Sequence, residues 1–248
     1  RAASPKAGKS THSKFKRAKK KEHIGNCKNA GQAWCREPES VLVHDYPQDA
    51  IGQAIPYGVY TLNTNQGYVC VGDCFDTPRF AVESIDNWWH EQGRKSFPNA
   101  RRLLILADAG GSNSCRSRVW KAQLQEQICD MYRLDVTVCH YPNGCSKWNP
   151  IEHRLFSHIS MNWAGKPLRS FELMCAYIEG TTTSTGLTVR ADLVRGGNEL
   201  GERVSNEEMK QLRLQYHSLC PQWNYTLKPR PLRQVEARWR ARYEKYGM

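Results

Sequence analysis

The sequence predicts an α/β domain in which helices flank a mixed sheet, and three observations support this prediction. Successive apolar and β-branched segments indicate strands in the first half of the chain. Further along, strand patterns alternate with helical patterns, as they do in α/β domains. Hydrophobic residues make up 40% of the 248 residues, which is enough to build a core. We therefore expect one globular domain.

The first strands are predicted to form an antiparallel meander. Segments 41–47 (VLVHDYP), 54–62 (AIPYGVYTL) and 66–73 (QGYVCVGD) are rich in β-branched and aromatic residues. Between the second and the third lies NTNQG, a hairpin-turn pattern. Three strands in succession, with a short turn between two of them, indicate antiparallel neighbours.

Helices and strands then alternate. We predict helices at 77–94, 117–133, 149–165 and 170–182, and strands at 101–108 and 134–142. Thr77 is a typical N-cap, and apolar residues spaced four apart from Ile151 to Trp163 form one stripe. The overall order, a meander followed by alternating helices and strands, is that of an RNase H-like domain.

Basic segments lie at both ends of this domain. Residues 1–23 are dense in Lys and Arg and poor in apolar residues, so we expect a disordered basic tail there. Residues 228–248 are also basic and are expected to form a helix, from about Leu232 onward, or a tail. The predicted catalytic domain therefore spans residues 24–227.

The charge of the chain indicates a polyanionic partner. The formal net charge is +12 and the pI is about 9.3, which favours nucleic acid over the alternative of an anionic membrane surface. No apolar run is long enough to cross a bilayer, and no signal-peptide core precedes the domain. We expect an intracellular, cytoplasmic protein.

The ten cysteines contain no Cys-x-x-Cys pair and are expected to be reduced and structural. One alternative is a zinc site built from Cys70, Cys74, Cys139, His140 and Cys145. Several of these residues lie in strand-like runs, so small buried residues are the favoured interpretation.

Two carboxylates are candidates for catalysis. Asp108 ends an apolar strand pattern and is followed by AGGSN, while Glu152 lies in the first turn of a predicted helix. Each has a structural alternative, as a turn residue for Asp108 and as a partner of the helix dipole for Glu152. A strand end and a helix start can converge over a sheet edge, and converging carboxylates favour a divalent cation. We predict Mg²⁺, with Mn²⁺ as an alternative, and phosphoryl transfer on nucleic acid.

Residues around Glu152 suit a nucleic-acid partner. Lys147 and Arg154 can contact phosphates, Trp148 can stack on an unpaired base, and Asn149 or His153 can orient a strand or the residues around the metal. Simpler roles stand beside these: Trp148 can brace the loop, His153 can face solvent and Asn149 can be a turn residue.

Five segments of the sequence resemble one group of transposases. They are IPYGVYTLNTNQGYVCVG, FAVESIDNWW, LLILADAGGSNSCRSRVWK, VTVCHYPNGCSKWNPIEHRLFSHISMNWAGKPL and WNYTL. They are similar to bacterial insertion-sequence DDE transposases of the ISAzo-thirteen family, over roughly residues 20–227. The resemblance implies Mg²⁺-dependent DNA cleavage and strand transfer, with Asp108 and Glu152 as two of three metal ligands. It also implies a homo-oligomer on DNA and a place at the bacterial nucleoid.

The first acid of the family is not found. Members of the family read Val-Asp-Thr-Lys-Lys-Lys-Glu at that point, whereas this chain reads KRAKKKEHIGN, with Arg17 at the position of the Asp. The upstream apolar strand and the N-terminal DNA-binding region are not found either, so a decayed or frame-shifted fragment is one interpretation. The other is that Asp45 or Asp73 substitutes, although turn or strand-edge roles fit both residues.

Two functions therefore stand side by side. The first is a metal-dependent DDE transposase, impaired where Arg17 replaces an acid. The alternative is a non-catalytic, nucleic-acid-binding remnant that keeps the basic surface without a metal site.

Overall fold

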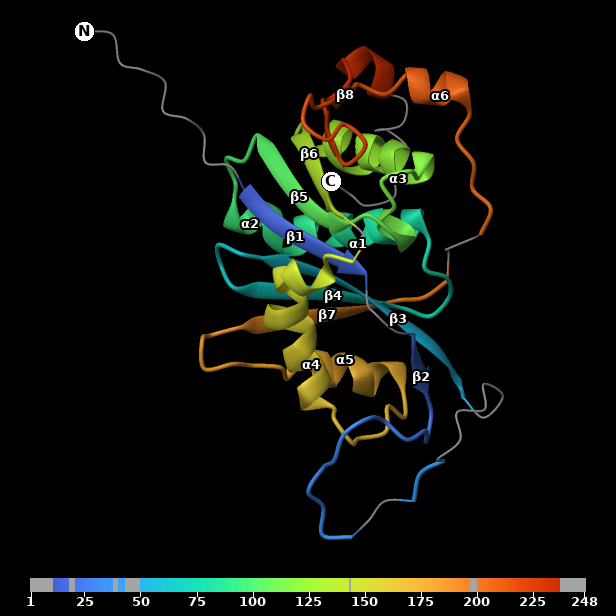
Figure 1. Ribbon diagram of the computed structural model, residues 1–248, viewed down its shortest axis with the longest axis vertical. Helices are drawn as coiled ribbons and strands as arrows, with labels where there is room; N and C mark the ends of the chain where they lie inside the picture. Colours follow the sequence, from blue (N-terminus) through green and yellow to red (C-terminus); the bar gives the residue numbers. More distant parts are fainter. Residues whose placement is uncertain are drawn as a thin grey trace, which may run out of the picture.

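The computed structural model describes residues 11–17, 21–37, 40–42, 50–142, 144–196 and 200–236 (Figure 1). The strands are β1 (Thr11–Arg17), β2 (Glu22–Ile24), β3 (Gly52–Thr61), β4 (Gln66–Gly72), β5 (Arg102–Asp108), β6 (Asp135–Tyr141), β7 (Thr188–Val194), β8 (Leu214–Tyr216) and β9 (Asn224–Leu227). The α-helices are α1 (Pro78–Trp88), α2 (Arg94–Ser96), α3 (Arg118–Gln123), α4 (Ser157–Asn162), α5 (Phe171–Glu179) and α6 (Asn206–Lys210). Wider π-helical turns extend three of these helices: η2 (Trp89–Gly93) follows α1, η4 (Leu124–Asp130) follows α3 and η6 (Glu152–Phe156) precedes α4. Short 3-10 turns are η3 (Gly111–Asn113) and η5 (Ser146–Trp148).

One mixed sheet organises the described part of the chain. Its strand order is β7-β4-β3-β1-β5-β6-β9-β8, and β2 pairs with β3 beside this path. The strands β1, β5 and β6 are parallel, and β3 is antiparallel to both β1 and β4. The predicted RNase H-like mixed sheet flanked by helices is therefore confirmed, and the carboxyl ends of β1, β5 and β6 meet at one edge.

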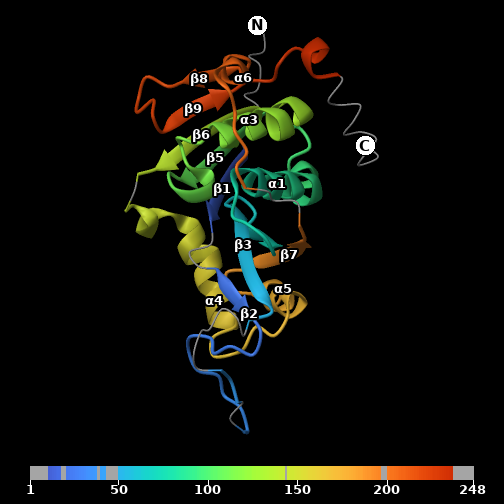
Figure 2. The ribbon, with the colours of Figure 1, turned by 90° about the vertical axis from the view of Figure 1, so that its right-hand side faces the viewer.

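Helices cover both faces of the sheet, as Figures 1 and 2 show. On one face α1, α3 and η4 bury a core that includes Trp88, Trp120 and Tyr225, all 0% exposed. On the other face α4 and α5 cover β3, β4 and β7. In the described chain, no helix covers the face of β5, β6 and β9 that lies on the side of α4. That face of the sheet is open.

Local sequence signals explain the helices. The Thr77 side chain accepts a hydrogen bond from the backbone N–H of Phe80 at 3.2 Å, which confirms it as the N-cap of α1. The apolar stripe from Ile151 to Trp163 is buried against the sheet, as predicted. The ring of Phe156, in η6, packs closely on β3 at Gly58. A Cβ at this position would lie 2.6 Å from the ring, so glycine suits the contact.

Strand β1 lies within residues 1–23, where the sequence predicts a tail. Its Lys14 backbone stands opposite Tyr60 of β3 on one side and Leu106 of β5 on the other. The structure thus differs from the prediction over residues 11–17, because strand pairing uses backbone groups that every residue type supplies. Most of the predicted strand at 41–47 lies outside the described residues; Leu42 forms an isolated bridge with Cys27.

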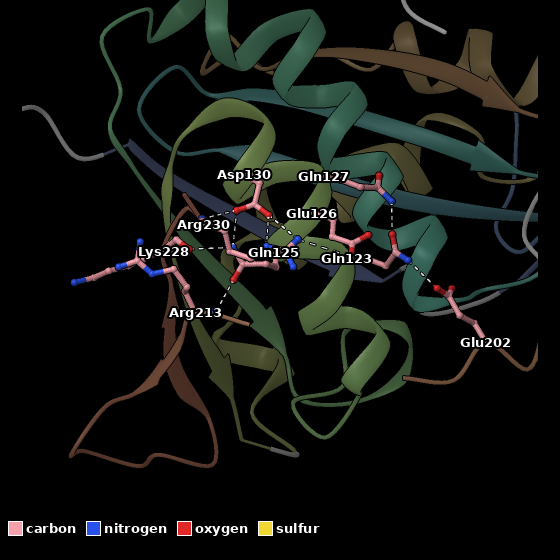
Figure 3. Close-up of polar contacts among 9 residues, drawn as sticks. All are labelled: Gln123, Gln125, Glu126, Gln127, Asp130, Glu202, Arg213, Lys228 and Arg230. Atoms are coloured by element: carbon pink, nitrogen blue, oxygen red, sulfur yellow. Dashed lines mark hydrogen bonds and ion pairs between the residues drawn. The ribbon is translucent and has the colours of Figure 1, made fainter. Parts of the chain in front are cut away.

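The C-terminal segment is held to the domain by a buried ion pair (Figure 3). Asp130 accepts two bonds from the Arg230 guanidinium, both 2.8 Å, and one from the Arg230 backbone N–H at 2.7 Å. Gln125 joins them, donating to Asp130 at 2.9 Å and to the carbonyl of Lys228 at 3.0 Å. Residues 228–230 therefore pack on the domain instead of forming a tail. A helix does begin at Leu232, and residues 237–248 lie outside the described chain.

We predict that Asp130→Asn lowers the free energy of unfolding by about 3 kcal/mol, because it removes the carboxylate charge 2.8 Å from the buried Arg230 guanidinium and leaves Arg230 with the more distant Glu126, at 3.9 Å. Urea unfolding followed by circular dichroism measures the change. The control is Lys95→Ala, which breaks an exposed pair with Glu91 and is expected to cost less than about 1 kcal/mol. Equal losses in the two variants would contradict a stabilising role for the buried pair.

Candidate active site

Asp108 stands at the carboxyl end of β5 and is half-buried. Its Oδ1 accepts a hydrogen bond from Asn149 Nδ2 at 3.2 Å, and its backbone carbonyl accepts one from His140 Nδ1 at 3.0 Å. The chain turns sharply after it, and Gly111 adopts φ +65°, a conformation that favours glycine. Gly111 thus has a structural role in the turn after Asp108.

His140 lies beneath Asp108, and elementary chemistry fixes its tautomer. A carbonyl only accepts, so Nδ1 carries the proton that bonds Asp108. Burial lowers the pKa of His140 from its usual 6.5 to about 4, so the ring is neutral at pH 7. Its Nε2 must then accept from the Tyr225 hydroxyl at 3.1 Å, and Tyr225 in turn accepts from Trp120 Nε1 at 2.8 Å. The donor and the acceptor of each hydrogen bond in this series are therefore fixed.

Asn149 joins the two candidate acids. It is 0% exposed, its side chain donates to Asp108, and its backbone carbonyl accepts the N–H of Glu152 at 3.1 Å. Glu152 begins η6 and is half-buried. The structure therefore brings Asp108 and Glu152 to the same end of the sheet. Asn149 is enclosed between them, where it holds a carboxylate and cannot contact DNA while it stays buried.

The four other predicted site residues lie on the surface beside Glu152. Lys147, Trp148, His153 and Arg154 are exposed, and the exposed fraction of Trp148 is 68%. The Lys147 ammonium lies 5.0 Å from the centre of the Trp148 ring, and His153 Nε2 bonds the Lys147 carbonyl at 2.7 Å. Two cations and one aromatic ring are thus exposed around the acids.

Sequence reasoning missed the buried groups that support Asp108. Tyr57 of β3 donates to Asn113 Oδ1 at 2.8 Å, and both residues are buried. Burial first, and then the charges of Asp76 and Asp108 among other groups, raise the pKa of Tyr57 well above its usual value. One sequence signal indicated that His140 is buried: it continues the alternation of Val136 and Val138, which occupy the buried positions of β6.

A metal-ligand set is incomplete in the described residues. No group of three or more His, Cys, Asp or Glu side chains there can hold a metal ion, so neither the zinc alternative nor a complete three-acid set is found. Asp73 has a strand-edge role, one of the two roles that the sequence favoured, because its Oδ1 accepts the N–H of Gly196 at 2.8 Å, just beyond the neighbouring strands β4 and β7. Asp45 lies outside the described residues. The carboxylates of Asp108 and Glu152 are hard oxygen ligands of the kind that Mg²⁺ prefers, and they are two of the three acids that the resemblance implies.

Comparisons with known proteins define the family. A family model described as the Rhodopirellula transposase DDE domain matches residues 15–229. The chain belongs to this family. The prediction of an ISAzo-thirteen DDE transposase is therefore confirmed at the level of family.

Solved structures of Mos1 transposase are similar to this member of the DDE family. A paired-end complex with the left transposon end matches with a TM-score of 0.45 and 13% identity, over 65% of this chain and 44% of that chain. The Mos1 strand transfer complex matches with the same score and identity, over 68% and 45%. A mariner paired-end complex with Mn has a TM-score of 0.41 and 10% identity, over 65% and 45%. This chain thus spans less than half of each Mos1 chain. No curated protein sequence matches it.

Among the helices that the structure describes, none is long and apolar enough to cross a membrane.

We predict that His140 makes folding sensitive to acid. Its pKa is lower in the folded chain than its usual 6.5, so the unfolded chain binds a proton first as the pH falls below about 6.5. The stability contributed by the neutral ring is therefore present above 6.5 and is lost towards pH 4, by about 3 kcal/mol.

Urea unfolding at a series of pH values, with His140→Asn as the matched control, measures this loss. Asn keeps a donor for the Asp108 carbonyl but does not titrate, so its stability should fall less between pH 7 and pH 4. Parallel pH profiles for the two proteins would contradict the buried neutral histidine.

Proposed function

We propose that this chain is a DNA-binding transposase domain built for metal-dependent DNA cleavage and strand transfer, in which the replacement of one acid impairs catalysis. The observation that carries the proposal is the position of Asn149 at the carboxyl end of β5, where its side chain donates to Asp108 and its backbone carbonyl accepts the N–H of Glu152. Mg²⁺ or Mn²⁺ would be held by these two oxygen-ligand residues. Lys147, Trp148 and Arg154 support the same proposal, because exposed cations and an aromatic ring suit DNA.

The third ligand position falls at the end of β1. By its resemblance to the family, the chain carries Arg17 where the first Asp is expected. Arg17 is the last residue of β1, which is parallel to β5, so its backbone belongs to the same sheet edge as Asp108. A guanidinium repels the cation that a carboxylate would hold there. We therefore propose low or no cleavage by this chain as it stands, and a homo-oligomer when it assembles on DNA ends.

A second candidate function is DNA binding without catalysis. It is favoured by the finding that the described residues supply no group of three metal ligands. In that case binding falls steeply with salt but does not respond to Mg²⁺. The substitution Arg17→Asp decides between the two functions.

We predict that Arg17→Asp raises Mg²⁺- or Mn²⁺-dependent nicking of supercoiled DNA by at least about 100-fold, because it supplies the missing carboxylate. Agarose-gel assays of plasmid relaxation, with and without chelator, measure the rate.

Two controls sharpen this test. Arg17→Ala removes the positive charge without adding a ligand and should stay near the starting rate. Asp108→Asn in the Arg17→Asp background should abolish the gain. If the Arg17→Asp variant binds DNA and remains folded yet shows no metal-dependent nicking, the non-catalytic function is the correct one.

A further inference from the structure

The open face of the sheet carries a polar groove that the proposed function does not use. It has a volume of about 690 Å³ and lies over β5, β6, β8 and β9. Its lining consists of Arg102, Asp135, Thr137, Gln215, Tyr216, His217, Thr226 and Lys228. The groove is at the amino ends of β5 and β6, away from the end that carries Asp108.

The floor of the groove is a row of hydrogen-bonded side chains across three neighbouring segments. Thr137 of β6 and Thr226 of β9 bond through their hydroxyl groups at 2.9 Å. His217 Nε2, directly after β8, bonds the Thr226 hydroxyl at 2.8 Å. This row fixes the floor, so that side chains on it are held in place before any partner binds.

The charges of the groove favour an anion. Arg102 and Lys228 are the basic residues opposite a single acid, Asp135, among the lining residues. Gln215 and the threonines add neutral groups that donate hydrogen bonds to oxygen. Cations interspersed with neutral donors match the phosphate backbone of a nucleic acid, which is a repeating row of negatively charged oxygens.

The groove is continuous with the face that presents Asp108. Side chains alternate along a strand, so Arg102 and Asp108, six residues apart in β5, lie on the same face. The burial pattern agrees, because the residues between them on that face are partly exposed while those on the other face are buried. At about 3.3 Å per residue the two ends are about 20 Å apart, close to six nucleotide steps of a DNA strand.

We propose that this groove binds the backbone of a DNA segment that extends from Asp108 and Glu152 along the open sheet face. The residues that would contact the DNA are Arg102, Thr137, Gln215 and Lys228. The inference rests on the proposed function, since it assigns a second contact region to the same DNA. The groove would be a second DNA-contact region. The first consists of the residues around Glu152, at the opposite end of β5.

Fluorescence anisotropy with a labelled 20-base-pair duplex tests this proposal. In the variant Arg102→Gln/Lys228→Gln, two phosphate contacts are lost. We expect Kd to rise about tenfold at 100 mM salt and the slope of log K against log salt to become shallower by about two. Gln215→Glu, an isosteric change at an exposed position, should also weaken binding, because it adds a negative charge to the groove.

The matched control is Lys28→Gln/Arg190→Gln, which removes the same charge from exposed positions in the loop after β2 and in the edge strand β7. This control should change Kd less than twofold. Equal losses in both double variants would show a general charge effect and overturn the groove. The proposal is also overturned if the unmodified chain binds DNA and neither groove variant changes its Kd.

Two further outcomes have separate meanings. If the unmodified chain does not bind the duplex at any salt concentration, the proposed function fails, and the groove proposal with it. If the groove variants bind DNA normally but shift the mass measured by light scattering, the groove is an interface between two copies of the chain, which overturns DNA as its occupant. Thermal melting of each variant confirms that the fold is intact.

Discussion

A single hydrogen bond beneath Asp108 ties the candidate site to the far end of the chain. The donor is His140 Nδ1, which can donate to the Asp108 carbonyl and accept from Tyr225 only while the ring is neutral. Tyr225 belongs to β9, and the segment after β9 is held by the pair of Asp130 with Arg230. The backbone at Asp108 thus depends on a strand more than 100 residues away in the sequence. The paired strands β8 and β9 therefore help to position Asp108.

The side chain that holds the carboxylate of Asp108 adds no positive charge beside it. Asn149 donates to Asp108 and accepts from the backbone of Glu152, and its side chain is a neutral amide. A Lys or Arg in the same place would hold the carboxylate equally well but would offset its negative charge, leaving less attraction for a cation. A buried amide is therefore suited to fix the direction of a carboxylate whose charge is needed elsewhere.

Local sequence patterns predicted the helices and strands that bury at least one of their sides in the core. The strands β3 to β6 and the helices α1, α3, α4 and α5 follow apolar periodicity and capping residues such as Thr77, which act within a few residues. The strands β1, β8 and β9 are different. They are short or polar, so apolar periodicity does not reveal them. β1 and β9 pair with strands far away in the sequence, and β8 pairs with β9. Likewise Asp108 and Glu152 could be found from their positions, whereas the Tyr225 contact with His140 could not.

The strand that carries Arg17 shows that the fold and the chemistry make separate demands on the sequence. The backbone of β1 bonds β3 and β5 through groups common to all residues, so a polar, lysine-rich segment can occupy the centre of the sheet. A metal site, in contrast, needs a carboxylate at one defined position, and no backbone group replaces its charge there. A change at the end of β1 can therefore remove a ligand and leave the sheet, the helices and the basic surfaces in place. For this reason membership of a transposase family, which the whole domain establishes, is compatible with the loss of the reaction, which depends on three side chains.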